Sequence, residues 1–429
     1  MASLLVIWGF LLISLVSTSG FGIWNVFAIF RRKNYQAAYK PNIQRHFNHM
    51  YILIPALNEA GQIVNTINLM HRVVHHLPIT TSLVIINDGS DDGTGEKLKQ
   101  FSGDPFIHVI TRELPNARQG KGLALNAGLR WIESQSHHPK NTIVGVIDSD
   151  AKPTRQVMER ICQAFIHSNY DLIQTAIAIN NVTNFLTLMQ AFEFDYPNLL
   201  QQVIRTEWGS AIASGNGQFM TLQMAADVKW HNALLDDLEF SINGLLKGYR
   251  GGFLADTFMP QEGVLTYRPL VKQRVRWCQG GMQCLFKYGK TLFFSKRIPS
   301  KLKTEILIFM GLPFLSIIFS ISSIISFGVL IAHLFIWPAS SILIGTTIFL
   351  ISTFITAAMI AMTDHSLHHT KCLFSVKQAG LMTVGNLIYI WQLVPVAYIA
   401  LIHLMTNQTT WAKTAHAMQS EQRPNNSQS

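Results

Sequence analysis

The sequence predicts an α/β domain, built on a mainly parallel sheet with flanking helices, together with about four transmembrane helices. Two observations lead to this expectation. Short apolar runs alternate with helical patterns between residues 50 and 150, and long apolar runs with almost no charge lie towards the two ends of the chain. Such alternation is typical of right-handed βαβ units, whose strands are parallel. The terminal runs are long enough for a membrane helix, which needs about 20 apolar residues.

The composition narrows the class of protein. The chain has 429 residues, of which 48% are apolar and only 14% are charged, against about 25% charged in soluble proteins. The formal net charge is +10, which suits nucleic acid, anionic lipid or a phosphate-bearing ligand. We expect no nucleic acid partner, because no basic run is dense. The four cysteines lack metal-site spacing, and unpaired thiols fit a reducing cytosol.

Residues 1–33 are expected to form an N-terminal membrane anchor. Residues 4–30 carry no charge, and three basic residues follow at positions 31 to 33. A cleavable signal peptide has its positive charge before the apolar run instead. The observed order favours an uncleaved span whose C-terminal side faces the cytoplasm. We therefore expect an integral protein of the plasma or inner membrane with a cytosolic domain at residues 34–285.

The C-terminal third predicts three more spans within residues 305–405, followed by a polar tail at 406–429. Their apolar runs are residues 305–335, 340–362 and 380–404. Aromatic residues and five lysines or arginines lie just before the first run. This composition favours an interfacial segment at residues 286–304 on an anionic leaflet, although a solvated loop is an alternative.

In the central domain, the ligand side of the sheet is marked by polar residues. The expected strands are residues 51–57, 82–89, 106–112 and 142–150, and the expected helices are 59–76, 93–101 and 118–135. Ligands of parallel sheets bind beyond the carboxyl ends of the strands. Acidic or small residues follow three of these strands, including Asn58, Glu59, Asp88, Asp148 and Asp150. Neither a dinucleotide fingerprint nor a Walker A sequence is present, so a nucleotide bound here needs a metal to bridge its phosphates.

The sequence Asp-Ser-Asp at 148–150 is a candidate metal site. Two carboxylates at a strand end can bind Mg²⁺ or Mn²⁺ and leave coordination positions for phosphate. The same tripeptide also occurs by chance in solvated turns. Its position at the end of an apolar strand favours the metal.

Two further clusters have a structural and a functional interpretation. Asp236, Asp237 and Glu239 begin a helical pattern, where acids often serve as caps or dipole partners; Asp237 could instead be a general base. The run QRVRW at 273–277 suits a basic interfacial helix, or it could bind a diphosphate through its arginine forks. Arg274 would either assist this binding or face lipid headgroups.

Several ordered segments resemble the inverting family 2 glycosyltransferases of the GT-A fold. The likeness is greatest to the membrane-embedded processive synthases of cellulose, hyaluronan and poly-N-acetylglucosamine. The segments are IPALNEA, INDGSDDGT, RQGKGLALNAGL, VIDSDAKP, SGNGQFMT, DDLEFSINGLLKGYR and QRVRW, in this order along the chain.

The resemblance implies roles for individual residues in donor binding. Asp88 would contact the uracil base, and the surrounding nucleotide pocket would be shaped by Pro55, Asn58 and Glu59. Lys121 would neutralise the nucleotide side of the donor, and Asp148 would lie near the ribose and pyrophosphate.

The same resemblance implies the reacting centre. Asp150 would coordinate the divalent metal, and Gln273 and Arg276 would bind the pyrophosphate. Asp237 would be the catalytic base, and Trp277 would stack on the acceptor sugar. The motif reads Leu-Asp-Asp here, where relatives have Thr-Glu-Asp, so the register against Asp236 stays open.

The resemblance implies transfer from a UDP-sugar, with a preference for UDP-N-acetylglucosamine, onto a growing β-linked polysaccharide. Polar residues in the last span, at positions 386, 392 and 403, could line a channel or be satisfied within the bundle. One alternative is addition of a single sugar to a lipid acceptor. Another is a catalytically silent membrane module that binds UDP-sugar. An accessory membrane subunit is left open.

Overall fold

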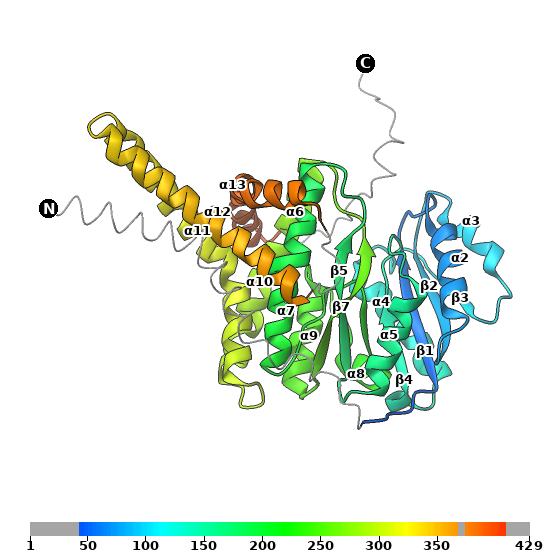
Figure 1. The fold of residues 1–429 in the computed structure, drawn as a ribbon. Helices are drawn as coiled ribbons and strands as arrows, with labels where there is room; N and C mark the ends of the chain where they lie inside the picture. The colour runs from blue at the N-terminus through cyan, green and yellow to red at the C-terminus, as the bar shows by residue number, and fades with distance from the viewer. Residues whose placement is uncertain (1–42, 368–373, 409–429) are drawn as a thin grey trace, which may run out of the picture.

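The computed structural model describes residues 43–367 and 374–408. The expected N-terminal anchor at 1–33 and the tail beyond residue 408 lie outside these residues. Figure 1 shows the sheet and its flanking helices on one side of the molecule, with the yellow to orange helices of the C-terminal third on the other.

A seven-stranded sheet forms the centre of the first part. Its strands, in chain order, are β1 (His49–Ala56), β2 (Thr80–Asp88), β3 (Ile107–Arg112), β4 (Thr142–Val146), β5 (Leu172–Ile179), β6 (Gln218–Thr221) and β7 (Gly251–Gln261). Their spatial order is β3-β2-β1-β4-β6-β5-β7. All pairs are parallel except those of β6, which runs antiparallel to both β4 and β5. The expectation of a mainly parallel sheet is confirmed.

Helices cover both faces of this sheet and bury two separate apolar clusters. One cluster lies under α2 (Ile63–Val74), α3 (Thr94–Leu98) and α5 (Arg155–Ile166). The other lies under α4 (Lys121–Gln135), α8 (Leu222–Val228) and α9 (Asp236–Lys247). The four expected strands and three expected helices are all present, with ends shifted by a few residues. The fourth strand, for example, ends at Val146, so the Asp-Ser-Asp sequence lies in the loop that follows.

A helical segment after β5 joins the sheet to the C-terminal helices. It consists of α6 (Phe185–Glu193), a π-helical turn η4 (Phe194–Asn198) and α7 (Leu199–Glu207). Its apolar side chains share one buried cluster with residues of β5, β7 and three of the C-terminal helices. The sequence analysis did not identify this segment or strands β5 to β7.

Four long helices form the C-terminal part: α10 (Tyr267–Phe294), α11 (Ser300–Leu334), α12 (Pro338–Leu367) and α13 (Val376–Met405). The last three are long and apolar enough to cross a membrane, and they overlap the three C-terminal runs expected from the sequence. The expected interfacial segment is divided between the end of α10, a short turn and the start of α11. The fourth expected span is the N-terminal anchor, which lies outside the described residues.

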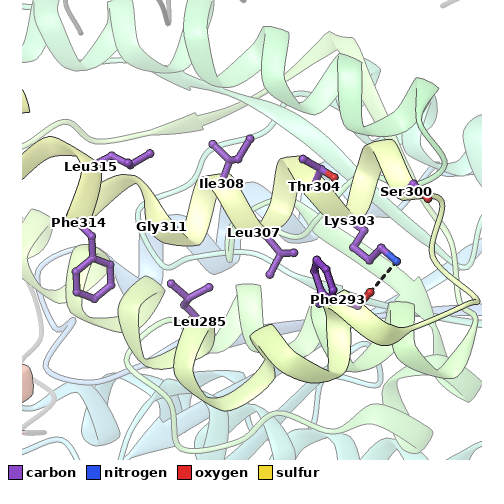
Figure 2. Close-up of a pocket in the computed structure, with 10 residues that line it drawn as sticks. All are labelled: Leu285, Phe293, Ser300, Lys303, Thr304, Leu307, Ile308, Gly311, Phe314 and Leu315. Atoms are coloured by element: carbon purple, nitrogen blue, oxygen red, sulfur yellow. Dashed lines mark hydrogen bonds between the residues drawn. The ribbon is translucent and has the colours of Figure 1, made fainter. Parts of the chain in front are cut away.

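An apolar groove of about 640 Å³ runs between the second half of α10 and the first half of α11. Leu285, Phe293, Leu307 and Phe314 line it, and Lys303 lies near one end, as Figure 2 shows. The Lys303 ammonium group donates to the carbonyl oxygen of Phe293 at 2.8 Å. The groove thus has a polar end near the start of α11 and an apolar end further along this helix.

A buried ion pair ties α7 to the long apolar helix α11. Arg205 donates from Nε and Nη2 to the two carboxylate oxygens of Glu305, at 2.7 and 2.9 Å. The two side chains are only 4% and 6% exposed, and the guanidinium lies 4.4 Å from the centre of the Phe309 ring. Because both charges are shielded from water, each depends on the other for its stability.

Replacing Glu305 alone should destabilise the protein strongly. A Glu305→Leu variant leaves the buried Arg205 without its counter-charge, which typically costs about 3–5 kcal/mol. Thermal unfolding in detergent would measure the loss. The matched control is the double variant Arg205→Met with Glu305→Leu, which removes both charges and should recover most of the stability. A double variant as unstable as the single one would contradict the prediction.

Candidate active site

Three loops meet around Lys121 at the carboxyl end of the sheet. Lys121 begins α4, and its ammonium group donates to Asp148 Oδ1 at 2.5 Å and to the carbonyl oxygen of Gly215 at 3.3 Å. The backbone amide of Asp148 in turn donates to the side-chain oxygen of Asn216 at 3.2 Å. The loop after β4 and the loop before β6 are therefore both bound to the start of α4.

Gly215 brings this loop against the side chain of Asp237. Its φ of +83° is in the left-handed region that favours glycine, and a Cβ there would lie 3.2 Å from Asp237 Oδ2 and 3.7 Å from Lys121 Nζ. The carboxylate of Asp237 and the ammonium group of Lys121 thus lie on the same side of the glycine loop.

Asp236 and Asp237 occupy the first turn of α9, where the helix dipole favours negative charge. Even so, burial, together with the adjacent charge of Asp236, raises the pKa of Asp237 to about 7. Burial likewise raises the pKa of Asp236, against the opposing effects of Lys121 and Arg276. A carboxyl group that titrates near neutral pH is well suited to accept a proton there.

The same three carboxylates affect the pKa values of both cations of the site. Burial opposes the charge on Lys121, but Asp148, Asp236 and Asp237 outweigh burial and raise the pKa of Lys121. For Arg276 burial is the larger effect and lowers the pKa, although the same three carboxylates oppose it. Three acidic and two basic side chains therefore form one electrostatic cluster.

Arg276 reaches this cluster because α10 packs closely against the start of α9. A Cβ on Gly280 would lie 2.6 Å from Leu235 Cβ and 2.9 Å from the backbone nitrogen of Leu235. Leu235 directly precedes Asp236 and Asp237. Only glycine at position 280 lets the two backbones approach this closely, and Arg276 lies about one helical turn earlier on α10.

Asp150 lies two residues after Asp148 in the same loop. It is 3% exposed, and its Oδ2 accepts a hydrogen bond from the backbone amide of Glu262 at 3.2 Å, just after β7. Within residues 43–367 and 374–408, no group of three or more His, Cys, Asp or Glu side chains could hold a metal. Mg²⁺, however, commonly uses one or two protein carboxylates plus substrate phosphates. The oxygen donors of Asp148 and Asp150 fit that kind of site.

The residues expected around the nucleotide base lie on, or just after, the adjacent strands β1 and β2. Pro55 is in β1, and Asn58 follows it with a φ of 55°. The Asn58 amide group donates to Asp91 Oδ1 at 2.8 Å. The backbone amide of Glu59 donates to the Thr94 hydroxyl at 2.8 Å. These bonds hold the two loops together at the carboxyl edge of the sheet.

Asp88 is buried in an ion pair that the sequence analysis did not identify. It is 4% exposed and accepts a hydrogen bond from Arg112 Nη1 at 2.5 Å. Burial raises the pKa of Asp88, while Arg112 opposes this effect. Arg112 ends the parallel strand next to β2 and pairs in register with Asp88. Its position at the end of an expected strand was the only signal in the sequence.

The QRVRW run lies in the first half of α10, where Gln273 and Arg276 are one turn apart and both half-buried. Arg274 does not face outward, as one of its two interpretations required: this side chain is 7% exposed and pairs with Glu193 of α6. Its assistance in diphosphate binding stays a prediction. Its guanidinium lies 4.2 Å from the centre of the Trp277 ring. One face of the Trp277 indole is therefore covered, and a sugar ring could stack only on the other.

The structure thus brings Lys121, Asp148, Asp237 and Arg276 into one cluster, with Asp150 close by in sequence to Asp148. The donor-side residues Pro55, Asn58, Glu59 and Asp88 form a second group along the same edge of the sheet. The functional roles of these residues remain predictions. A mainly parallel sheet with one antiparallel strand and acidic strand ends, in place of a glycine-rich phosphate loop, is the arrangement of the GT-A nucleotide-sugar transferases.

Comparison with known proteins shows the family. The chain matches the family described as glycosyl transferase family group 2 over residues 143–363, which is more than half of its length. It also matches glycosyl transferase family 2 over residues 51–225. The protein therefore belongs to the family 2 glycosyltransferases and is a transferase.

Two sequence relatives and one solved structure of the same fold are similar to this chain. A β-monoglucosyldiacylglycerol synthase from Synechocystis is 31% identical over 48% of this chain and 42% of its own. A poly-β-1,6-N-acetyl-D-glucosamine synthase from Staphylococcus aureus is 26% identical over 65% of this chain and 66% of its own. A mannosyltransferase from Pyrobaculum calidifontis, solved with GDP-mannose and Mn²⁺, has the same fold, with a TM-score of 0.56 and 15% identity over 93% of this chain and 99% of that one.

The chain spans about half the length of the monoglucosyldiacylglycerol synthases that it matches, from 42% to 63%. The three long apolar helices and these relatives together indicate association with a membrane.

The close packing of α10 against the start of α9 at Gly280 can be tested with a matched pair of variants. Gly280→Ala should lower the rate of sugar transfer by about 10- to 100-fold, because it displaces Arg276 relative to Asp237 by a fraction of an ångström or more. Gly281→Ala, whose Cβ would meet nothing within 4 Å, should leave the rate unchanged. UDP release and thermal stability would be measured for both. Equal rates in the two variants would show that the spacing between α9 and α10 does not limit transfer.

Proposed function

We propose that this protein transfers a sugar from a UDP-sugar to a hydroxyl group of an acceptor at the membrane, with inversion at the anomeric carbon. The observation that carries the proposal is the carboxyl group of Asp237, whose pKa of about 7 and position beside Lys121 and Arg276 suit a general base. Family membership supports the reaction class.

The donor is held by residues from three parts of the carboxyl edge. Pro55, Asn58, Glu59 and Asp88 bind the uridine, with the Asp88 carboxylate oriented by Arg112. Lys121 and Asp148 lie beside the ribose and pyrophosphate. Gln273 and Arg276 donate hydrogen bonds to the pyrophosphate, where negative charge accumulates as the bond to the sugar breaks.

Asp237 then removes the proton from an acceptor hydroxyl. The oxygen attacks the anomeric carbon as UDP departs on the opposite side, so an α-linked donor gives a β-linked product. The proton ends on Asp237 and the negative charge on the diphosphate. Trp277 supports the acceptor sugar on the indole face opposite Arg274.

Asp150, with Asp148, is the proposed ligand of Mg²⁺ or Mn²⁺. When bound, such an ion neutralises charge on the diphosphate. The oxygen-only donor set supports this assignment, as does the Mn²⁺ in the mannosyltransferase of the same fold. Asp150 is oriented for this role by the backbone of Glu262.

The proposed acceptor is a growing β-linked polysaccharide, with N-acetylglucosamine as the preferred sugar. The similarity to the poly-N-acetylglucosamine synthase supports it. A second candidate is the addition of one sugar to a lipid. The monoglucosyldiacylglycerol synthases favour this candidate, because the match to one of them has the higher identity of 31%.

The proposed orientation puts the catalytic domain in the cytosol. The basic residues near the turn between α10 and α11 lie exposed beside Phe293 and Phe294, which are 60% and 69% exposed. Aromatic and basic side chains of this kind fit the surface of an anionic leaflet. Whether an accessory subunit takes part is left to experiment.

Replacing Asp237 should stop the reaction without stopping donor binding. Asp237→Asn keeps the size of the side chain but cannot accept the proton, and a general base contributes about 10²- to 10⁴-fold to the rate. UDP release and UDP affinity would be measured separately. Normal turnover by Asp237→Asn would refute this mechanism, and a larger effect of Asp236→Asn would transfer the role to Asp236.

The pH dependence checks the same assignment. Below about pH 7 the raised pKa keeps Asp237 protonated and unable to act as a base. The kcat/KM for transfer should therefore fall about tenfold for each pH unit below that point. A profile that stays flat down to pH 5 would contradict the assignment.

The product identifies the acceptor class. Membranes containing the protein would be incubated with Mn²⁺ or Mg²⁺ and a panel of UDP-sugars, and UDP release and product size would be recorded. We expect release with UDP-N-acetylglucosamine and a long polymer. A short glycolipid product would establish the lipid acceptor instead. Absence of release in a preparation that binds UDP would favour a silent binding module or a missing partner.

A further inference from the structure

We propose that the apolar helix α13 controls the acceptor site through a relay of four side chains, in which Tyr389 and Glu193 fix Arg274, and Arg274 fixes the ring of Trp277. Arg274 and Glu193 are positioning residues in this proposal. The inference rests on the proposed function, since it takes Trp277 as the surface on which the acceptor sugar stacks.

The relay starts with the carboxylate of Glu193, which accepts hydrogen bonds from side chains of two different helices. Arg274 Nη2 of α10 and the Tyr389 hydroxyl of α13 both donate to Oε2 of Glu193, the latter at 3.2 Å. Tyr389 is 1% exposed and Arg274 is 7% exposed. Three elements that are far apart along the chain therefore meet at a single oxygen atom.

Because Arg274 is buried, its side chain has little freedom to move away from Glu193. An arginine that is removed from water is stable only beside a counter-charge, so Arg274 has to remain where Glu193 is. Glu193 is the last residue of α6 and is followed directly by the π-helical turn. The Tyr389 hydroxyl is a second donor to the Glu193 carboxylate, and its position is set by α13.

The opposite end of the relay is the indole of Trp277. The Arg274 guanidinium covers one face of the ring at 4.2 Å, and Phe194 lies edge-on to it with a centroid distance of 6.5 Å. A cation held over an indole face favours one orientation of that ring. The orientation of the opposite face, where the acceptor would stack, therefore depends on the position of Arg274.

A direct hydrogen bond also joins α10 to α13. Tyr267, the first residue of α10, donates from its hydroxyl to the carbonyl oxygen of Gln392 at 2.5 Å. Apolar side chains of α10 and α13 also share a buried cluster. A displacement of α13 would therefore move α10 and the relay together.

The experiment removes one hydroxyl group from the membrane helix. Tyr389→Phe should raise the acceptor KM by roughly 3- to 10-fold, the effect of one lost hydrogen bond, with kcat and the donor KM unchanged. The probes are UDP-N-acetylglucosamine and UDP-glucose as donors, and a β-linked N-acetylglucosamine tetramer and dioleoylglycerol as acceptors. Slow hydrolysis of the donor without acceptor should also be unchanged, because it does not use Trp277.

The matched control is Tyr398→Phe on the same helix. Its hydroxyl bonds to Ser320 Oγ of α11 at 2.9 Å and takes no part in the relay, so all kinetic constants should stay as in the wild type. Arg274→Lys is a second test variant. It keeps the charge beside Glu193 but lacks the planar group over Trp277, so it too should raise the acceptor KM while thermal stability is kept.

The outcomes separate this inference from the proposed function. A higher acceptor KM for Tyr389→Phe and Arg274→Lys, but not for Tyr398→Phe, supports the relay. Unchanged acceptor KM in both test variants, or equal changes in donor and acceptor KM, overturns it and leaves the role of Asp237 intact. Full activity of Asp237→Asn would instead overturn the proposed function, whatever the relay variants do.

Discussion

The balance of charge at the carboxyl edge of the sheet is the constraint on which the rest of the structure depends. Asp148, Asp236 and Asp237 would repel one another if Lys121 and Arg276 were not among them. The two cations come from different elements, α4 and α10. The acidic edge is therefore complete only when α10, the helix that continues towards the membrane, is packed against α9.

This dependence explains why the sheet domain and the membrane helices are not independent units. The helical segment from α6 to α7 shares its apolar side chains with β5, β7, α12 and α13. Buried ion pairs and hydrogen bonds also connect the two parts. Arg205 pairs with Glu305 of α11, and Glu193 receives donors from both α10 and α13. An acceptor held in or on the membrane would thus meet a site whose shape the membrane helices help to set.

The residues at the strand ends are the part of the site that could be predicted from the sequence. Parallel strands bring their carboxyl ends to one edge, so Asp88 and Asp148 could be expected near each other from their place after apolar runs alone. The sequence analysis identified no strand after β4, and β6 is only four residues long, which leaves little of a strand pattern to recognise. The pairing of Asp88 with Arg112 depends on the register between β2 and β3, which the residues of either strand alone do not specify.

The sequence by itself determined the kinds of elements, the acidic edge and the membrane-spanning runs, because each depends on residues that are close together along the chain. Only the tertiary structure decided what Arg274 does. Its partner Glu193 lies 81 residues away, and Tyr389 lies 196 residues from Glu193. No local pattern encodes a pairing over such separations. This arginine, for which a lipid-facing position was one of two interpretations, is instead buried, and Glu193 at the end of α6 supplies the carboxylate that a buried arginine requires.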